Sequence, residues 1–392
     1  MTDKREQFGE ALFYFVLVLW ISTEVLFNST LEKFIIWKID EANDVFAVMV
    51  LALLIIKLLL LQKYSIRDIL VVGVISIPIV LATLNSGHNK MLSTWIFIVA
   101  AKKTNFDKSI KLAYYAQLVT TIIVLWMFFN GYINDVTIYR GHLLRHSLGF
   151  SHPNQLGMRI FMLVTCHCYL RKDKVNLFDA LLVLGAGLFV NKVANSKTAY
   201  YSLVIFAFIL LIHIIVRRIG INSNTFSNVW IIIAFLANAV SLLLTIVNVK
   251  HYNFLKVIDK YMSQRFFQCH RTLQYYGIKL FGQEVHLLVN KGMGRTLKFW
   301  LDNAYIAILV RYGIVVFILF TAMYLFTMAR MKEYNNIIVL EILCLYAIYG
   351  IMENNYFSMS NNLFLLTIAS FVFRDSTFTE KNSPRKRVVF SW

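Results

Sequence analysis

The feature of this sequence that most restricts its fold is a series of long apolar runs, which recur from Ala11 to Phe373. A helix crosses a bilayer core with roughly 20 apolar residues, whereas a transmembrane β-strand alternates apolar and polar residues over about 10. Runs such as Leu203–Ile215 and Trp230–Val247 are continuous rather than alternating. With 58% hydrophobic and 15% charged residues, the chain is predicted to be all-α, a polytopic bundle of transmembrane helices.

The apolar runs predict about twelve spans in a single integral membrane domain over residues 1–392. The first run lacks a small-x-small cleavage site and is followed by further runs, so we expect an uncleaved helix rather than a signal peptide. The predicted spans are 8–27, 45–61, 69–85, 91–101, 110–130, 155–170, 177–191, 198–216, 228–248, 303–329, 335–352 and 362–373.

The distribution of basic residues predicts the orientation. Twelve crossings place both termini on one side, and with that side cytoplasmic the inner segments hold 20 lysines and arginines against 7 in the short outer loops. The net charge of +18 is explained by basic residues in cytoplasmic loops and by attraction to anionic lipid, rather than by binding of nucleic acid. No nucleic-acid partner is therefore expected. We expect a multi-pass protein of the bacterial plasma membrane with both termini in the cytoplasm.

The four cysteines give no sign of a metal site or a disulfide framework. Cys166, Cys168, Cys269 and Cys344 contain no Cys-x-x-Cys pair, and three of them lie in apolar runs. We interpret them as small hydrophobic core residues, and we expect neither a metal nor a cofactor.

Two predicted outer loops, 131–154 and 249–302, carry most of the polar residues that suggest a site. The first loop ends in a run rich in arginine and histidine. Pro153 disfavours helix at His152, and Asn154 can cap the helix that follows. His152 would then face a helix N-terminus, where the dipole favours an anion. The alternative is a polar loop followed by an ordinary cap.

The second loop is too long for a simple connector, and loops of such length are often functional. Apolar residues recur in it at spacings of three and four, from Leu255 to Leu273, which predicts one helix that Gly277 ends. This amphipathic helix would lie on the outer leaflet with its basic side toward the headgroups. The alternative is a surface helix packed on the bundle without a ligand.

A few charged residues fall within or beside the predicted spans. Arg311 lies about nine residues into its span, where an unpaired arginine costs on the order of 3 kcal/mol and usually faces a cavity or a partner. Arg159 lies near the outer end of its span and can extend to the interface. Asp302 and Glu353 lie at outer span ends, where either carboxylate could pair with Arg311 or Arg159.

Three segments together resemble the bacterial Wzy/WaaL superfamily of polysaccharide polymerases and O-antigen ligases. They are Arg145-His146-Ser147-Leu148-Gly149-Phe150-Ser151-His152-Pro153-Asn154-Gln155-Leu156-Gly157, then Asn195-Ser196-Lys197-Thr198-Ala199, and lastly Gly292-Met293-Gly294 with Leu301-Asp302-Asn303-Ala304-Tyr305 and Tyr312-Gly313-Ile314. The resemblance covers about forty residues, and the His-Pro-Asn run is its most specific part. The order of the segments and their predicted placement on the outer face support it.

The resemblance implies a metal-independent glycosyltransferase that moves a glycan from undecaprenyl pyrophosphate to a hydroxyl of the next lipid-linked repeat unit. The implied partners are that lipid-linked oligosaccharide, membrane lipids, a flippase and a chain-length regulator. Because the diphosphate is a stabilised leaving group, basic side chains matter more than a general acid, and a base near the acceptor hydroxyl would help. The pyrophosphate-binding residues would be Arg145, Lys197, Arg295 and Arg311, with Arg265 and Arg271 as further candidates. Asp302 or His152 would orient or deprotonate the acceptor.

Two positions depart from the superfamily pattern. Ligases of the superfamily have histidine where this chain has Asp302, and this difference favours a polymerase. An exposed aspartate is a weak base near neutral pH, so either burial makes Asp302 a stronger base or another residue, such as His152, is the base. Lys197 stands where the superfamily has arginine, so the charge is kept and the bidentate fork is lost.

Other classes of function compete with this interpretation. The alternatives are ligase-type transfer to another acceptor and a lipid-linked oligosaccharide flippase or transporter. Transporters usually show repeats and broken helices with polar groups at the midplane, where this sequence is poor in polar residues apart from Arg311. A glycosyltransferase that uses the acidic pair Asp40-Glu41, and a scaffold without catalysis, are further alternatives.

Overall fold

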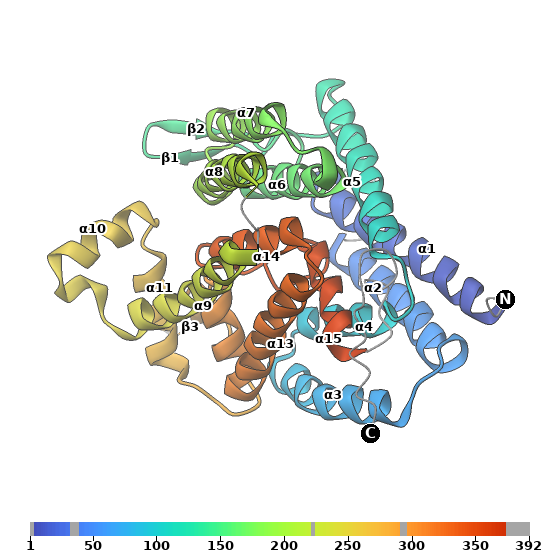
Figure 1. The fold of residues 1–392 in the computed structure, drawn as a ribbon. Helices are drawn as coiled ribbons and strands as arrows, with labels where there is room; N and C mark the ends of the chain where they lie inside the picture. Colours follow the sequence, from blue (N-terminus) through green and yellow to red (C-terminus); the bar gives the residue numbers. More distant parts are fainter. Residues whose placement is uncertain (1–3, 32–38, 221–223, 291–295, 374–392) are drawn as a thin grey trace.

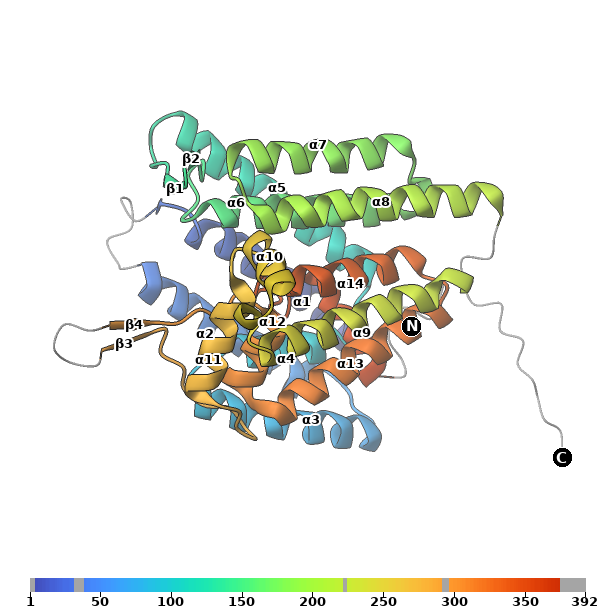
Figure 2. The same ribbon diagram turned by 90° about the vertical axis from the view of Figure 1, so that its left-hand side faces the viewer.

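The computed structural model describes residues 4–31, 39–220, 224–290 and 296–373, which form a bundle of helices with two small hairpins (Figures 1 and 2). The longer helices are α1 (Lys4–Phe27), α2 (Ile39–Ile56), α3 (Ile66–Ser86), α4 (Lys90–Ala100), α5 (Phe106–Phe129), α6 (Pro153–Leu170), α7 (Leu177–Val193), α8 (Lys197–Ile219), α9 (Asn224–Ile246), α10 (Asn253–Tyr261), α11 (Arg265–Tyr276), α13 (Gly313–Glu333) and α14 (Ile337–Gly350). Shorter elements are η2 (Lys57–Leu61), η3 (Lys172–Lys174), η4 (Val249–His251), α12 (Ala304–Ala307), η5 (Ile308–Tyr312), η6 (Leu363–Ile368) and α15 (Ala369–Val372). The hairpins pair β1 (Ile138–Arg140) with β2 (Leu143–Arg145), and β3 (Leu288–Asn290) with β4 (Thr296–Lys298). The predicted all-α membrane fold is confirmed in outline.

The predicted count of twelve spans is not supported. Within the described residues, 7 helices are long and apolar enough to cross a membrane: Lys4–Phe27, Ala42–Leu61, Ile66–Ser86, Phe106–Phe129, Lys197–Ile219, Phe226–Ile246 and Ala304–Glu333. The other five predicted spans correspond to α4, α6, α7, α14 and the pair η6–α15. The apolar residues of α14 and η6 face protein rather than lipid, and composition alone does not separate these two environments.

Helix α14 forms the centre of the bundle. All of its residues except Ile348 are buried, and it packs against α8, α9 and α13. A helix that is hydrophobic on all sides is expected in the interior of a large bundle. The segment that follows α14 therefore emerges in the middle of one end of the molecule.

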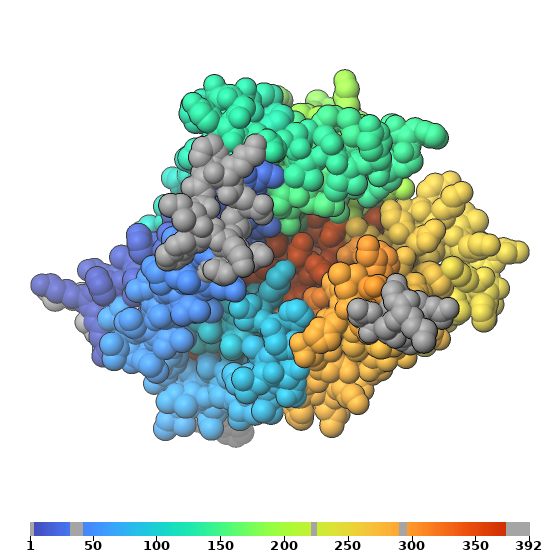
Figure 3. Space-filling view, turned by 180° about the vertical axis from the view of Figure 1, so that it is seen from behind, coloured from blue at the N-terminus to red at the C-terminus, as the bar shows by residue number. Residues whose placement is uncertain are grey.

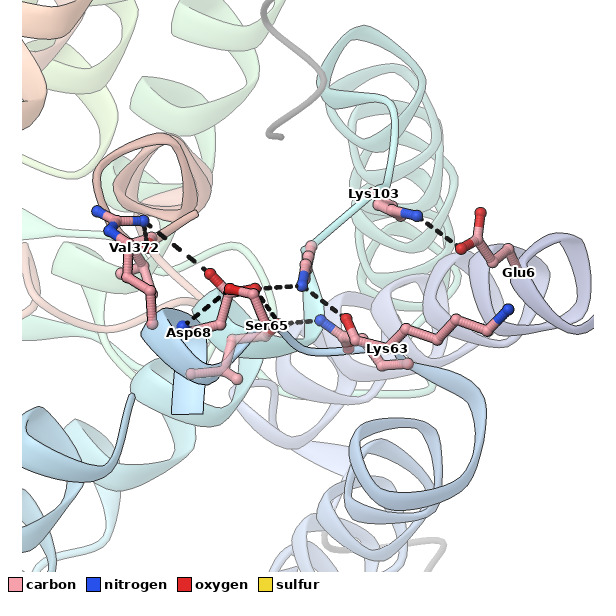
Figure 4. A network of polar contacts seen from close by, with 10 residues as sticks. Glu6, Lys63, Ser65, Asp68, Lys103 and Val372 are labelled. Carbon is pink, nitrogen blue, oxygen red and sulfur yellow. Dashed lines mark hydrogen bonds and ion pairs between the residues drawn. The ribbon is translucent and has the colours of Figure 1, made fainter. Parts of the chain in front are cut away.

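The two ends of the bundle differ. Both hairpins lie at one end, on the left of Figure 2, so loops 131–154 and 249–302 share one face, as the sequence predicts. At the opposite end, a polar network connects the starts of α1 and α3 with the α4–α5 turn and the end of α15 (Figure 4). Lys102 Nζ lies 2.7 Å from Asp68 Oδ2, Lys103 Nζ lies 2.6 Å from Glu6 Oε1, and Arg67 donates to the Val372 carbonyl. This network end is the one predicted to be cytoplasmic.

The loop between α5 and α6 is folded around one carboxylate. Asp135 Oδ1 accepts from the backbone amides of Ser147 and Leu148, at 2.8 and 3.0 Å, and Oδ2 lies 2.6 Å from His146 Nδ1. The Ser151 amide also donates to the Asn28 carbonyl at the end of α1. These bonds fix the chain just before the His-Pro-Asn turn.

The single amphipathic helix predicted over residues 255–273 is wrong in one respect, because it is broken into α10 and α11. Ser263 and Gln264 both adopt left-handed backbone conformations, with φ of 60° and 61°, which an α-helix cannot contain. The prediction that Gly277 ends the second helix is confirmed, since it follows Tyr276 with φ of 67°. The break turns the start of α11 toward the centre of the face.

Candidate functional site

Two arginines of the first hairpin reach the turn between α7 and α8. Arg145 Nε donates to the Ala194 carbonyl at 2.8 Å, and Arg140 Nη1 donates to the Asn195 carbonyl at 3.0 Å. The second of the three sequence segments starts at Asn195, so the first two segments meet here. Lys197, the first residue of α8, is close enough to Arg140 for the two positive charges to interact.

The His-Pro-Asn turn caps α6 differently from the prediction. His152, rather than Asn154, is the N-cap residue, and its Nδ1 accepts a hydrogen bond from the Asn154 amide at 3.0 Å. Pro153 at the first helical position favours this arrangement, because it holds His152 in an extended conformation. The Asn154 side chain is thereby free for the site. Its Oδ1 accepts from Arg145 Nη2 at 2.6 Å.

Glu353 lies at the centre of the site, three residues beyond the end of α14. Its Oε1 accepts from Asn154 Nδ2 at 3.2 Å, from Thr198 Oγ1 at 3.3 Å and from Arg265 Nη2 at 3.0 Å. The sequence suggested that this carboxylate could pair with Arg311 or Arg159, and that suggestion is wrong. The partner is Arg265, because the break before α11 points this arginine inward.

Asp302 completes the group beside Arg265. Its Oδ2 lies 3.9 Å from Arg265 Nη2, and 42% of its side chain is exposed. The next residue, Asn303, caps α12 and donates to Ser241, and Tyr305 donates to the Ala347 carbonyl. The third sequence segment thus contributes one exposed carboxylate to the site, while its asparagine and tyrosine hold the backbone in place.

These contacts form a continuous polar chain from Arg145 through Asn154, Glu353 and Arg265 to Asp302. Burial, together with the charge of Arg140, lowers the pKa of Arg145 to about 10, so it stays cationic near neutral pH. Burial opposes the charge of Arg265, but Glu353 and Asp302 outweigh it and raise the pKa of Arg265. The chain itself has two arginines and two carboxylates, and the neighbouring Arg140 adds a third guanidinium, which leaves the region positively charged.

Several of the segments that carry the polar chain border a depression in the face that bears the hairpins. Figure 3 shows this face, with a hollow between the green segment around residue 150, the cyan segment around residue 90 and the orange segment around residue 300. Its floor has the orange-red colour of α14 and the segment that follows it. We call this depression the central hollow.

Arg311 lies in a break of the last long span. It belongs to the π-helix η5, and the α-helical path resumes only at Gly313, whose φ is 87°. The loop after α11 packs on the break, since the Gln283 amide donates to the Arg311 carbonyl at 3.0 Å and the Ile314 amide donates to the Lys279 carbonyl. The guanidinium Nε of Arg311 is buried and has no hydrogen-bond partner among the described residues. Irregular backbone within a membrane span is tolerated where other parts of the protein cover it, and it often marks a functional position.

Arg159 and Arg271, which the sequence also singles out, lie elsewhere than predicted. Arg159 does not extend to the interface, because it is fully buried, with Nη1 donating to the Ser360 carbonyl and Nη2 3.9 Å from Glu24. Arg271 lies six residues after Arg265 on α11, on a different side of that helix, and forms no hydrogen bond or ion pair with the described part of the chain. Arg295 lies outside the described residues.

The structure brings Arg145, Arg265, His152 and Asp302 together and adds members that sequence reasoning did not assign. Arg140 and Asn154 were visible in the sequence as parts of the arginine-rich run and the His-Pro-Asn turn. Glu353 was visible as an acid at a span end, but its pairing depends on the break before Arg265. Among the described ranges, no group of three or more His, Cys, Asp or Glu side chains is arranged to hold a metal ion.

All four cysteines are free and buried, in keeping with the predicted role as core residues. Comparison with models of protein families, with curated proteins and with solved structures finds no match to this chain.

Proposed function

We propose that the protein is a lipid-linked glycosyltransferase of the polysaccharide-polymerase type, which transfers a glycan from a polyprenyl diphosphate to a hydroxyl of a second lipid-linked unit. The observation that carries the proposal is the convergence of Arg140 and Arg145, from the first hairpin, with Arg265, from α11, close enough for their charges to interact. Arg265 Nη1 is buried there without an acceptor among the described residues. A ligand with several oxyanions would supply that acceptor.

In this proposal the arginines bind the diphosphate, and they bind it more strongly as the glycosidic bond breaks. Charge develops on the departing diphosphate in the transition state, so preorganised guanidinium groups lower the barrier without any movement. Each charge-assisted contact contributes about 1.5–3 kcal/mol. Glu353 and Asn154 act as positioning residues, since they hold Arg145 and Arg265 at fixed distances.

The acceptor hydroxyl is assigned to Asp302 in this proposal. Its carboxylate is the exposed acid of the polar chain and can accept the hydroxyl proton from the hollow. His152 is the other candidate from the sequence, but its Nδ1 is engaged by the Asn154 amide, which places the proton on Nε2. Burial and the charges of Arg145 and Arg140 lower the pKa of His152, so the neutral cap is favoured.

A complementation experiment with matched charge changes tests the proposal. In cells that lack the gene, wild-type protein restores long surface polysaccharide. Arg145→Gln and Asp302→Asn at equal protein levels should give single-repeat or short chains, because the first loses diphosphate binding by about tenfold or more and the second loses the base. Arg271→Gln removes the same charge from the same face, outside the polar chain, and should leave chain length unchanged. Wild-type chains in the Arg145 and Asp302 variants would refute the proposal.

Transport of a lipid-linked oligosaccharide is the second candidate, and the helix break at Gly313 favours it. Discontinuous helices with polar groups at the break are typical of transporters. The two functions differ in what accumulates. A strain without a flippase accumulates units on the inner leaflet, whereas a strain without a polymerase displays single repeat units outside.

A further inference from the structure

A second group of basic side chains lies near Asp302 and outside the polar chain. His88 and Lys90 belong to the turn between α3 and α4, and Arg311 belongs to η5. The charge of Asp302 acts on both His152 and Arg311, so this carboxylate lies within electrostatic range of both groups. Figure 3 shows the cyan α3–α4 segment and the orange segment together on the lower rim of the central hollow.

The fold fixes these side chains through the loop after α11. Asn85 Nδ2, at the end of α3, donates to the Phe281 carbonyl at 2.9 Å. Two residues later, the Gln283 amide donates to the Arg311 carbonyl at 3.0 Å. Gly282 lies between them, where a Cβ would come within 2.2 Å of the Arg311 carbonyl oxygen. One tightly packed loop therefore holds both the α3–α4 turn and the break in the helix that carries Arg311.

None of the three side chains forms a hydrogen bond or an ion pair with the described part of the chain. Burial, together with the positive charges of Arg311 and Lys90, lowers the pKa of His88, while Glu284 opposes the shift. Lys90 is exposed, and its side chain donates no hydrogen bond to the described part of the chain.

The acids in the neighbourhood are already engaged. Glu284 lies 3.4 Å from His286, Glu24 lies 3.9 Å from Arg159, and Asp302 lies 3.9 Å from Arg265. Two cations and a neutral imidazole are thus left without an acceptor at the hollow.

We propose that His88, Lys90 and Arg311 form a subsite for an anionic substituent, a carboxylate or phosphate, on the sugar that accepts the transferred glycan. The inference rests on the proposed function and narrows it to an acidic acceptor saccharide. Asp302 lies within electrostatic range of both cationic groups, so an acceptor hydroxyl at Asp302 can place the donor diphosphate at one group and its own anionic substituent at the other. Neutral His88 supplies one hydrogen bond to the same ring.

The test compares sugars that differ in charge, with purified full-length protein in nanodiscs. The probes are methyl glucuronoside and glucose 6-phosphate, with methyl glucoside as the neutral reference. Wild type should bind at least one of the charged sugars about tenfold or more tighter than the neutral one, because the charged sugar forms a charge-assisted contact that the neutral sugar lacks. Lys90→Gln and Arg311→Gln should abolish that preference, while Arg311→Lys should keep part of it and control for folding. Lys256→Gln, on α10 outside the hollow, should behave as wild type.

The outcomes separate this inference from the proposed function. Equal binding of charged and neutral sugars, or a preference that survives Lys90→Gln and Arg311→Gln, would overturn the subsite. Displacement of the charged sugar by farnesyl diphosphate, in wild type and Arg145→Gln alike, would also overturn the subsite. His88, Lys90 and Arg311 would then bind a lipid headgroup rather than a sugar. If farnesyl diphosphate fails to bind wild type while the preference for a charged sugar persists, the proposed transfer fails and the anion subsite stands.

Discussion

The Nδ1 atom of His152 accepts a hydrogen bond from the Asn154 amide, and this contact requires an unprotonated nitrogen. Because the pKa of His152 is lowered in the folded protein, the unfolded chain takes up this proton first as the pH falls below about 6.5. The cap therefore contributes stability near neutral pH that is lost on acidification through the lowered folded pKa. A side chain that caps without titrating would not show this loss.

We predict that His152→Asn keeps the stability at pH 7.5 within about 0.5 kcal/mol, since asparagine is a strong N-cap residue. The loss of thermal stability between pH 6.5 and 5 should be smaller than in wild type. Thermal unfolding in detergent at several pH values measures both quantities, and His152→Ala, which should cost about 1 kcal/mol at pH 7.5, is the control. An identical pH dependence in wild type and His152→Asn would contradict the role as a neutral cap.

At the same scale, the sequence predicted which charged residues share a face better than it predicted their partners. Arg145, His152 and Asp302 were singled out because of residue type and spacing, and they do share one face. Glu353 was interpreted as a possible partner of Arg311 or Arg159, because nothing in the sequence shows that Ser263 and Gln264 break the helix and turn Arg265 inward. Pairings of this kind depend on backbone geometry at two residues.

At the scale of elements, the junction between η5 and α13 depends on two glycines that face each other. A Cβ on Gly313 would lie 2.4 Å from both the Gly282 amide nitrogen and the Leu280 carbonyl oxygen, and the φ of 87° disfavours any L side chain. The apolar run from Ala304 to Glu333 predicted a span but not its interruption, because tyrosine, glycine and isoleucine are also ordinary residues of a regular membrane helix.

We predict that Gly313→Ala destabilises the protein by at least about 2 kcal/mol and reduces any activity that depends on Arg311. The matched control is Gly185→Ala on α7, where a Cβ meets nothing within 4 Å and alanine should stabilise the helix by about 0.5–1 kcal/mol. Thermal unfolding of both variants in detergent provides the comparison. Wild-type stability of Gly313→Ala would mean that the loop after α11 does not pack against the break.

At the scale of the whole molecule, the apolar composition predicted a helical membrane protein and overestimated the number of crossings. Helix α14 and η6 are apolar because they are surrounded by other helices, and their lengths are too short for a bilayer. Which residues are buried by protein and which by lipid is a property of the assembled bundle. The shared face of loops 131–154 and 249–302 was nevertheless predicted, since each loop follows an odd number of predicted spans.

The proposed chemistry depends on the central hollow opening to the outside of the plasma membrane. Because all four native cysteines are buried, single introduced cysteines can report the sidedness against a low background. Tyr139, on the first hairpin, is 73% exposed beside the site, and Lys103, with 42% of its side chain exposed, lies in the polar network at the opposite end.

The most direct test of the account is therefore the labelling of Tyr139→Cys and Lys103→Cys by a membrane-impermeant maleimide in intact spheroplasts. The account predicts that Tyr139→Cys is labelled at once and that Lys103→Cys is labelled only after the membrane is permeabilised. Labelling of Lys103→Cys from outside, with Tyr139→Cys protected until permeabilisation, would place the hollow in the cytoplasm and contradict the proposed transfer to an outward-facing acceptor.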